Sequence, residues 1–103
     1  MIAMVLAAAV ASASPAQLEH GHEVFAKWCA PCHAPGPEHP GTDALRAKYK
    51  GAKPAELEAR RDLPPETTRF FVRHGVSIMP FFRKTEITDA DLDALGAYLA
   101  RSR

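Results

Sequence analysis

Cysteine is scarce in this sequence, and the two that occur lie close together. Cys29 and Cys32 are the only cysteines among the 103 residues, which excludes a multi-disulfide framework and a four-cysteine zinc site. A single Cys-x-x-Cys pair is also compatible with a small thioredoxin-like disulfide. That fold needs a βαβ unit, and no stretch alternates between apolar and polar residues as a strand would.

Long apolar runs are missing as well. The uncharged run at residues 1–11 has about half of the roughly 20 residues that cross a bilayer. Ala11-Ser12-Ala13 follows it and matches a signal-peptidase site, so we expect residues 1–13 to be a secretory signal peptide and residues 14–103 the exported, periplasmic domain. Cleavage after Ala16, a short membrane anchor and a packed helix are the alternatives. The basic residues that usually precede such a run are absent, as expected if the start is truncated or misplaced.

Charge is nearly balanced. The chain carries 13 lysine and arginine and 12 aspartate and glutamate residues, a formal net charge of +1. The basic excess that nucleic-acid binding requires is therefore lacking. With 47% hydrophobic and 24% charged residues, the composition is that of one globular domain. In such a protein, local charged patches rather than the global field select partners.

Apolar residues recur at helical spacing. Leu18, Phe25 and Cys29, with Gly21 between them, predict a first helix over about residues 17–29. Glycine inside a helix costs about 1 kcal/mol relative to alanine. Gly21 therefore needs a reason, and close approach of another backbone is one.

Prolines and glycines mark the ends of three shorter helices. We expect them between Thr42 and Gly51, over residues 54–61 and over residues 66–74. Thr42 is the expected cap of the first, and Pro65 and Gly75 are the expected start and stop of the last. Phe70 and Phe71 are expected to face inward from this last segment.

The final helix has the clearest boundaries. Thr88 followed by Asp91 resembles a capping box, and acidic residues in the first turn suit the helix dipole. An apolar stripe follows, with an aromatic residue beside it: Leu92, Leu95, Leu99 and Tyr98.

Residues 29–33 read Cys-Ala-Pro-Cys-His, which is the signature of c-type haem attachment. Two thiols one helical turn apart can add to the two vinyl groups on one side of a porphyrin, and the imidazole of His33 then reaches the iron. This attachment takes place outside the cytoplasm, in agreement with export. A zinc site would need four ligands, and a second cysteine pair is missing. The motif therefore predicts covalent haem at Cys29 and Cys32, with His33 as an iron ligand.

The candidates for the second axial ligand of the iron are reduced by elimination. Of the three methionines, only Met79 lies outside the expected signal peptide. Pro80 biases Met79 toward an extended backbone, which helps to aim a loop side chain. His/Met ligation raises the haem potential and favours electron transfer. The alternative is that Met79 only fills the core.

Four histidines are rival ligands for the iron. His20 and His22 lie on the helix that leads into the attachment motif, so they can hardly reach the opposite haem face. His39 and His74 are conceivable ligands, but we expect them at the surface or at helix ends.

The residues so far resemble those of a bacterial class I cytochrome c over residues 17–101. That family crosses its first and last helices through a glycine and an aromatic residue that meet a leucine and an aromatic residue. Gly21, Phe25, Leu95 and Tyr98 stand at the corresponding spacings. The resemblance implies an all-α class I cytochrome c fold, with three to five helices around one covalently bound haem.

The resemblance also implies which residues surround the haem. In the family, a proline carbonyl accepts the second N–H of the proximal imidazole. Pro40 is favoured because it leads into the next helix, and Pro37 stays open. The expected pocket residues are Phe25, Tyr49, Phe70, Phe71, Phe81 and Phe82. Arg46, Tyr49 and Trp28 are candidate propionate partners or walls, and a surface or core role is the alternative for each.

The segment from Phe71 to Phe82 is similar to the methionine-ligand region of the cytochrome subunits of 4-cresol and eugenol hydroxylases. In those proteins a flavin in a large subunit oxidises a para-alkylphenol, and the electrons pass singly to the cytochrome. We therefore expect a flavoprotein large subunit as partner. A free periplasmic shuttle to a terminal oxidase or another acceptor is the alternative.

We expect no enzymatic activity from the chain alone, because a six-coordinate haem leaves no open site for substrate. A haem sensor or a weak peroxidase is the alternative if Met79 does not hold the iron. Four basic residues flank the methionine loop and would suit an acidic partner face, with a solvated surface of scattered counter-charges as the alternative: Arg69, Arg73, Arg83 and Lys84.

Overall fold

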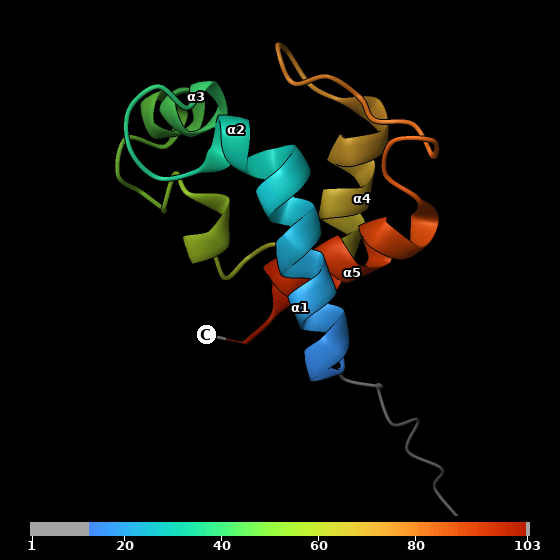
Figure 1. The fold of residues 1–103 in the computed structure, drawn as a ribbon. Helices are drawn as coiled ribbons and strands as arrows, with labels where there is room; N and C mark the ends of the chain where they lie inside the picture. The colour runs from blue at the N-terminus through green and yellow to red at the C-terminus, as the bar shows by residue number, and fades with distance from the viewer. Residues whose placement is uncertain (1–12, 103) are drawn as a thin grey trace, which may run out of the picture.

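A continuous helix opens the described part of the chain, residues 13–102 of the computed structural model. It comprises α1 (Pro15–Val24), a π-helical turn (Phe25–Cys29) and α2 (Ala30–His33) (Figure 1). Ser14 caps it, because its side chain accepts a hydrogen bond from the Gln17 backbone N–H at 3.1 Å. The helix thus begins two residues before the expected start. Residues 1–12 of the expected signal peptide lie outside the described residues.

The π-helical turn lies directly before the cysteine pair. Within it, the backbone N–H of Ala30 donates to the carbonyl of Phe25, five residues back. Such a turn inserts one extra residue into the helix and is frequent at functional sites. Cys29 ends the turn with φ −108°. Residue spacing alone did not predict this irregularity.

Two of the middle elements differ from the expectation. Helix α3 spans Pro40–Tyr49 with His39 as its cap, so Thr42 lies inside the first turn and the expected cap is wrong. Proline at the first helical position explains the earlier start, because it has no N–H to leave unpaired. The expected helix over residues 54–61 is also wrong, since only a 3-10 turn forms there, at Leu57–Ala59.

The last two helices agree with their expected boundaries. Helix α4 spans Pro65–His74 and ends at Gly75, whose φ of +69° suits glycine. Helix α5 spans Asp89–Ala100, and the Thr88 side chain accepts a hydrogen bond from the Asp91 N–H, so the expected cap is confirmed.

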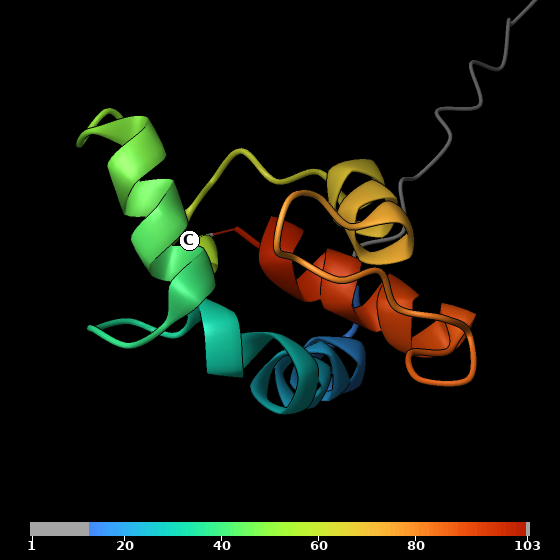
Figure 2. The same cartoon turned by 90° about the horizontal axis from the view of Figure 1, so that it is seen from above.

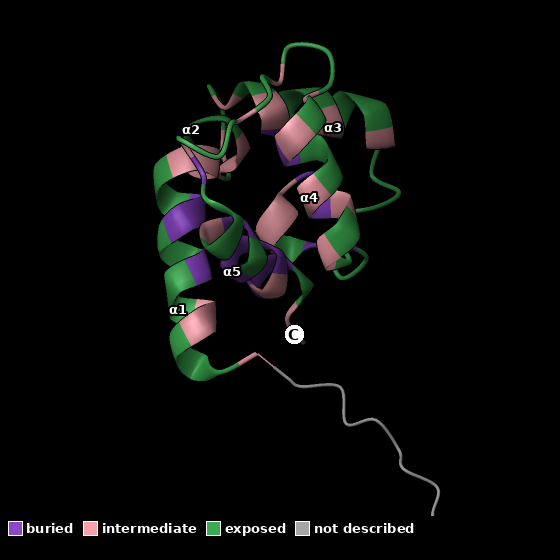
Figure 3. Cartoon of the chain, turned by 90° about the vertical axis from the view of Figure 1, so that its right-hand side faces the viewer, coloured by how far each residue is buried: buried purple, intermediate pink, exposed green. Residues whose placement is uncertain are grey.

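The core forms where α1 crosses α5 (Figure 2). A Cβ on Gly21 would lie 2.1 Å from the carbonyl oxygen of Ala94 and 2.7 Å from the Cβ of Tyr98, so only glycine permits this approach. Phe25 and Leu95 are buried beside the crossing, and the rings of Phe25 and Tyr98 are 6.1 Å apart. The expected contact between the first and last helices is therefore confirmed. Figure 3 shows buried segments on both of these helices, with others on α4.

Helices account for the regular structure of residues 13–102, which confirms the all-α prediction. The one β-feature in this range is an isolated bridge between Val76 and Met79. None of the helices in the described range has the length and apolar character needed to cross a membrane. Helices α2 and α3 lie to one side of the molecule, and α4 with the loop that follows it lies to the other (Figures 1 and 2).

Candidate haem-binding site

The two cysteines lie one turn apart at the end of the first helix. Cys29 is half-buried and Cys32 is exposed, and both thiols are free. Burial raises the pKa of the Cys29 thiol to about 12, so this group stays protonated and is a poor ligand for a free metal ion. Both sulfur atoms are available for addition to a porphyrin.

His33 is packed against the start of α3. A Cβ on Gly41 would lie 2.7 Å from Cε1 and 2.8 Å from Nδ1 of the His33 ring. Burial lowers the pKa of His33, which favours the neutral imidazole that an iron atom requires. Nδ1 is buried and has no hydrogen-bond partner among the described residues. The described structure therefore contains no hydrogen bond from His33 to a proline carbonyl. Whether Pro37 or Pro40 accepts this bond when haem is present stays a prediction.

Two hydrogen bonds close the turn between α2 and α3 beneath His33. The hydroxyl of Thr42, which is 0% exposed, donates to the carbonyl of Ala34 at 2.8 Å. The Nδ1 of His39 lies 3.1 Å from the carbonyl oxygen of Pro31. These contacts bring α3 back onto the attachment motif. They give Thr42 and His39 structural roles in place of the cap and the rival ligand.

Met79 lies in a tight loop that starts at Gly75. The backbone N–H of Met79 donates to the Val76 carbonyl at 2.9 Å, and the Val76 N–H donates back to the Met79 carbonyl at 3.1 Å. A Cβ on Gly75 would lie 2.6 Å from the Met79 carbonyl oxygen. The loop therefore folds closely over the end of α4. It extends from the side of the molecule opposite α2 and α3 (Figures 1 and 2).

Several large apolar side chains near this loop are exposed. The exposed fractions are 54% for Phe70, 38% for Phe71 and 60% for Phe81. The polypeptide core instead takes Thr68 and Val72 from α4. The expectation that Phe70 and Phe71 face inward is therefore wrong for the polypeptide core, although both stay candidates for contact with haem. Phe82 is half-buried and packs edge-on against Trp28, with ring centroids 5.8 Å apart.

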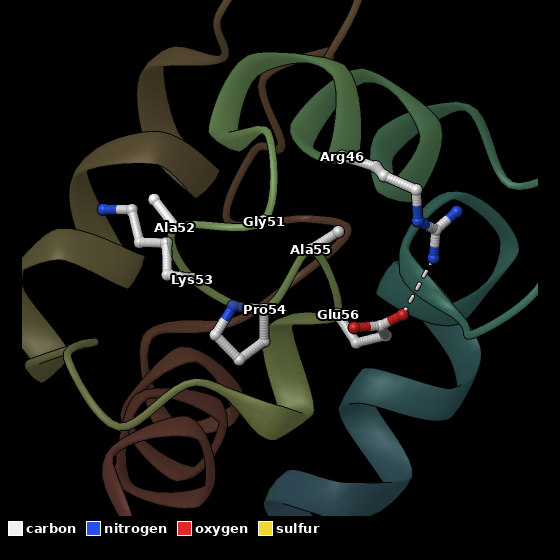
Figure 4. Close-up of a pocket in the computed structure, with 7 residues that line it drawn as sticks. All are labelled: Arg46, Gly51, Ala52, Lys53, Pro54, Ala55 and Glu56. Atoms are coloured by element: carbon white, nitrogen blue, oxygen red, sulfur yellow. Dashed lines mark hydrogen bonds and ion pairs between the residues drawn. The ribbon is translucent and has the colours of Figure 1, made fainter.

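The other expected pocket residues have protein partners. Phe25 belongs to the core. The Tyr49 hydroxyl accepts a hydrogen bond from the buried Arg60 at 2.8 Å. Arg46 pairs with Glu56 at 2.9 Å, beside a surface pocket that residues 51–56 line with it (Figure 4). Propionate contacts of Tyr49 and Arg46 stay predictions.

The rival histidines are engaged elsewhere. His20 lies 2.6 Å from the Asp91 carboxylate, which raises the pKa of the imidazole. His22 stacks on Tyr98, with ring centroids 5.2 Å apart. The Nδ1 of His74 lies 2.7 Å from the Phe70 carbonyl oxygen, within its own helix.

Taken together, these residues fit a covalently held haem. The chain provides two free thiols one turn apart, an imidazole packed beside them whose pKa is lowered by burial, and a thioether on a loop from the other side. Exposed aromatic rings on α4 and the loop provide the apolar contact that a porphyrin requires.

Comparison with known proteins gives the same indication. A family model described as cytochrome C oxidase, cbb3-type, subunit III matches residues 16–99. The chain belongs to the cytochrome c family. It is similar to cytochrome c6 of Cyanidioschyzon merolae (strain NIES-3377 / 10D), with 32% identity over 84 residues, which is 82% of this chain and 73% of the relative.

Membership of this family confirms three of the expectations. The helices form the class I cytochrome c fold, the cofactor is one covalent haem c, and the chain is an electron carrier rather than an enzyme. His/Met ligation and the two named attachment cysteines are not tested by this match. The resemblance to hydroxylase subunits is likewise not shown by it.

The arginines and the lysine around the loop do not form an unpaired basic rim. Arg69 pairs with Glu66 and Asp93, at 3.5 Å and 3.6 Å. Arg83 pairs with Glu86 at 3.3 Å. Both Arg73 and Lys84 pair with Asp89, at 2.9 Å and 3.4 Å. The cytochrome therefore carries counter-charges at every one of these positions, as the alternative reading of a mixed surface predicted.

Sequence reasoning missed Gly41 and the structural role of Thr42. Gly41 follows a proline within the first turn of a helix, where glycine costs about 1 kcal/mol relative to alanine. As at Gly21, that cost is a signal of close packing. No sequence pattern would have indicated that Thr42 reaches the Ala34 carbonyl, because that contact depends on how the turn folds.

Proposed function

We propose that Cys29 and Cys32 hold the haem through thioether bonds and that His33 and Met79 are its axial ligands. The placement of the two ligand-bearing segments on opposite sides of the molecule supports this assignment. When bound, the haem supplies one-electron exchange between ferrous and ferric iron. The protein's own residues orient the ligands and limit water access to the iron.

The spectrum of the purified holoprotein tests this proposal. We expect low-spin iron with a sulfur-to-iron charge-transfer band in the oxidised state, and loss of that band in Met79→Ala. Ile78→Ala is the matched control, because it alters the same loop at a side chain that is 76% exposed and keeps the sulfur. High-spin iron in the native protein, or ready carbon monoxide binding at neutral pH, would contradict Met79 ligation and favour the sensor or peroxidase alternative.

We further propose that this cytochrome accepts electrons from the flavin of a large subunit that oxidises para-alkylphenols. The similarity of residues 71–82 to the hydroxylase cytochromes supports this partner. Each substrate molecule would give up two electrons, and the single haem would take them one at a time, with its iron re-oxidised by a further electron acceptor between the two steps. Val76 and Ile78, exposed by 55% and 76%, provide an apolar surface beside Met79. Such a surface suits a lasting interface better than a freely diffusing carrier.

The free shuttle is the second candidate function. The similarity to cytochrome c6 is consistent with it. Both candidates use the same haem, so the partner decides between them. Co-purification from native cells provides the test: recovery with a flavin-containing subunit supports the hydroxylase, and a lone cytochrome supports the shuttle.

A periplasmic location is part of the same proposal. Haem attachment at a Cys-x-x-Cys-His motif outside the cytoplasm requires export, which residues 1–13 would direct. Cell fractionation with mass determination of the mature N-terminus tests this. An unprocessed chain would contradict the signal-peptide assignment.

A further inference from the structure

Arg73 occupies an unusual position at the base of the loop that carries Met79. It lies on the last turn of α4, and its side chain is 20% exposed. Its Nη1 donates to the carbonyl oxygens of Phe82, at 3.2 Å, and of Ile87, at 2.8 Å. Its Nη2 bonds to the Asp89 carboxylate at 2.9 Å. One side chain thus joins the end of α4 to the returning arm of the loop and to the start of α5.

Few other hydrogen bonds connect the Met79 loop to the rest of the described structure. The Phe82 N–H donates to the Val72 carbonyl at 2.7 Å, so Phe82 is held through both its N–H and its carbonyl. Ile87 is 0% exposed and belongs to the core. Among the described residues, the backbone hydrogen bonds of the segment between Gly75 and Phe82 join only Val76 and Met79 to each other. The position of Met79 therefore depends on the base of the loop.

We infer that Arg73 is a positioning residue for the Met79 ligand: by bridging Phe82 and Ile87 it keeps the loop closed and the thioether in place. This inference rests on the proposed Met79 ligation. Hydrogen bonds from a charged donor are stronger than those between neutral groups. The planar guanidinium can serve two carbonyls and a carboxylate together, which the point charge of a lysine does less well.

Imidazole provides a direct probe, because it binds ferric iron only when Met79 leaves it. We expect Arg73→Gln to bind imidazole about tenfold more tightly than the native protein, which corresponds to about 1.4 kcal/mol. Arg73→Lys should fall between the two. The sulfur-to-iron band should persist in both variants without imidazole, since the ligand is loosened rather than removed.

Two control variants separate the carbonyl bonds from general charge effects. Arg69→Gln removes an arginine one turn earlier on α4 whose ion pairs, within residues 13–102, are to Glu66 and Asp93. This variant should leave imidazole affinity unchanged. Asp89→Asn removes the ion-pair partner and keeps the two carbonyl acceptors, and should change the affinity less than twofold.

The possible failures are distinguishable. If the native protein lacks the sulfur-to-iron band, the Met79 assignment fails and this inference fails with it. If the band is present but Arg73→Gln and Arg73→Lys bind imidazole as the native protein does, only the role of Arg73 is refuted. If Arg73→Gln does not fold, Arg73→Lys decides. An equal effect in Arg69→Gln would also refute it, because a charge effect would then suffice.

Discussion

Replacing Gly41 with alanine would place a methyl group against the ring of His33. The new Cβ would lie 2.7 Å from Cε1 of His33 and 2.8 Å from the carbonyl oxygen of Cys32. Comfortable contacts between carbon atoms are about 3.5–4.0 Å, so the ring or the start of α3 must move by about 0.8 Å. The Cys32 carbonyl is a backbone group and cannot swing aside, so we expect the His33 ring to take much of the movement.

The cost can be estimated from two opposing effects. Overpacking a well-packed site costs about 1–3 kcal/mol, whereas alanine gains up to about 1 kcal/mol over glycine within a helix. We therefore expect Gly41→Ala to lower the free energy of unfolding by about 1–2 kcal/mol. For a domain of this size that is a fall in Tm of about 5–15 °C.

Stability alone would not show that the ring of His33 has moved. The proton shifts of the haem methyl groups in the oxidised state depend on the orientation of the axial imidazole, so they should change in Gly41→Ala. Gly96→Ala is the control, because the nearest atom to its Cβ would be the Pro65 Cβ, at 3.2 Å. It should alter Tm modestly and leave the methyl shifts unchanged. Unchanged shifts in Gly41→Ala would refute the argument that Gly41 sets the ring position.

Three further substitutions test the fold around the site. Gly21→Ala should lower the free energy of unfolding by about 3 kcal/mol, measured by denaturant titration, because its Cβ would meet the Ala94 carbonyl at 2.1 Å; a smaller loss than in Gly96→Ala would contradict the close crossing. Thr42→Val leaves the Ala34 carbonyl without its buried donor and should cost about 1–3 kcal/mol, with Thr42→Ser retaining most of the stability. His20 has a raised pKa beside Asp91, so its protonated form stabilises the fold below pH 6.5 and the benefit is lost as the pH rises through the folded pKa. The Tm difference between native protein and His20→Gln should therefore be larger at about pH 5.5 than at about pH 9, and an equal difference at both would refute the pairing.

The helices of the core were predictable because their signals are local. Thr88 with Asp91, and Pro65 with Gly75, mark helix ends through bonds between neighbouring residues, so the sequence carries the information directly. The prediction that Thr42 caps a helix is wrong, because its hydroxyl reaches across the turn to Ala34 rather than to its own helix. A capping pattern shows that a side chain is able to cap a helix. Whether the capping hydrogen bond forms depends on the tertiary contacts of that side chain.

The Phe70 and Phe71 assignment failed for a different physical reason. Periodicity identifies apolar residues that must leave water, but it does not say what covers them. In α4 the polypeptide core takes Val72 and Thr68, and the two phenylalanines stay exposed. For a haem protein this exposure is expected, because the porphyrin is part of the core and some of the apolar surface contacts the cofactor rather than another helix.

Arg73 shows the opposite case, a charged residue that is buried. Arg73 looks like a surface charge in the sequence, yet its side chain is four-fifths buried and bonds to two backbone carbonyls. Because those acceptors are backbone atoms, any residue could stand at Phe82 or Ile87 and offer the same carbonyl. The side-chain pattern of the sequence therefore cannot predict this contact. Residues that hold a ligand loop in place are best identified from the hydrogen bonds to backbone atoms at the base of the loop.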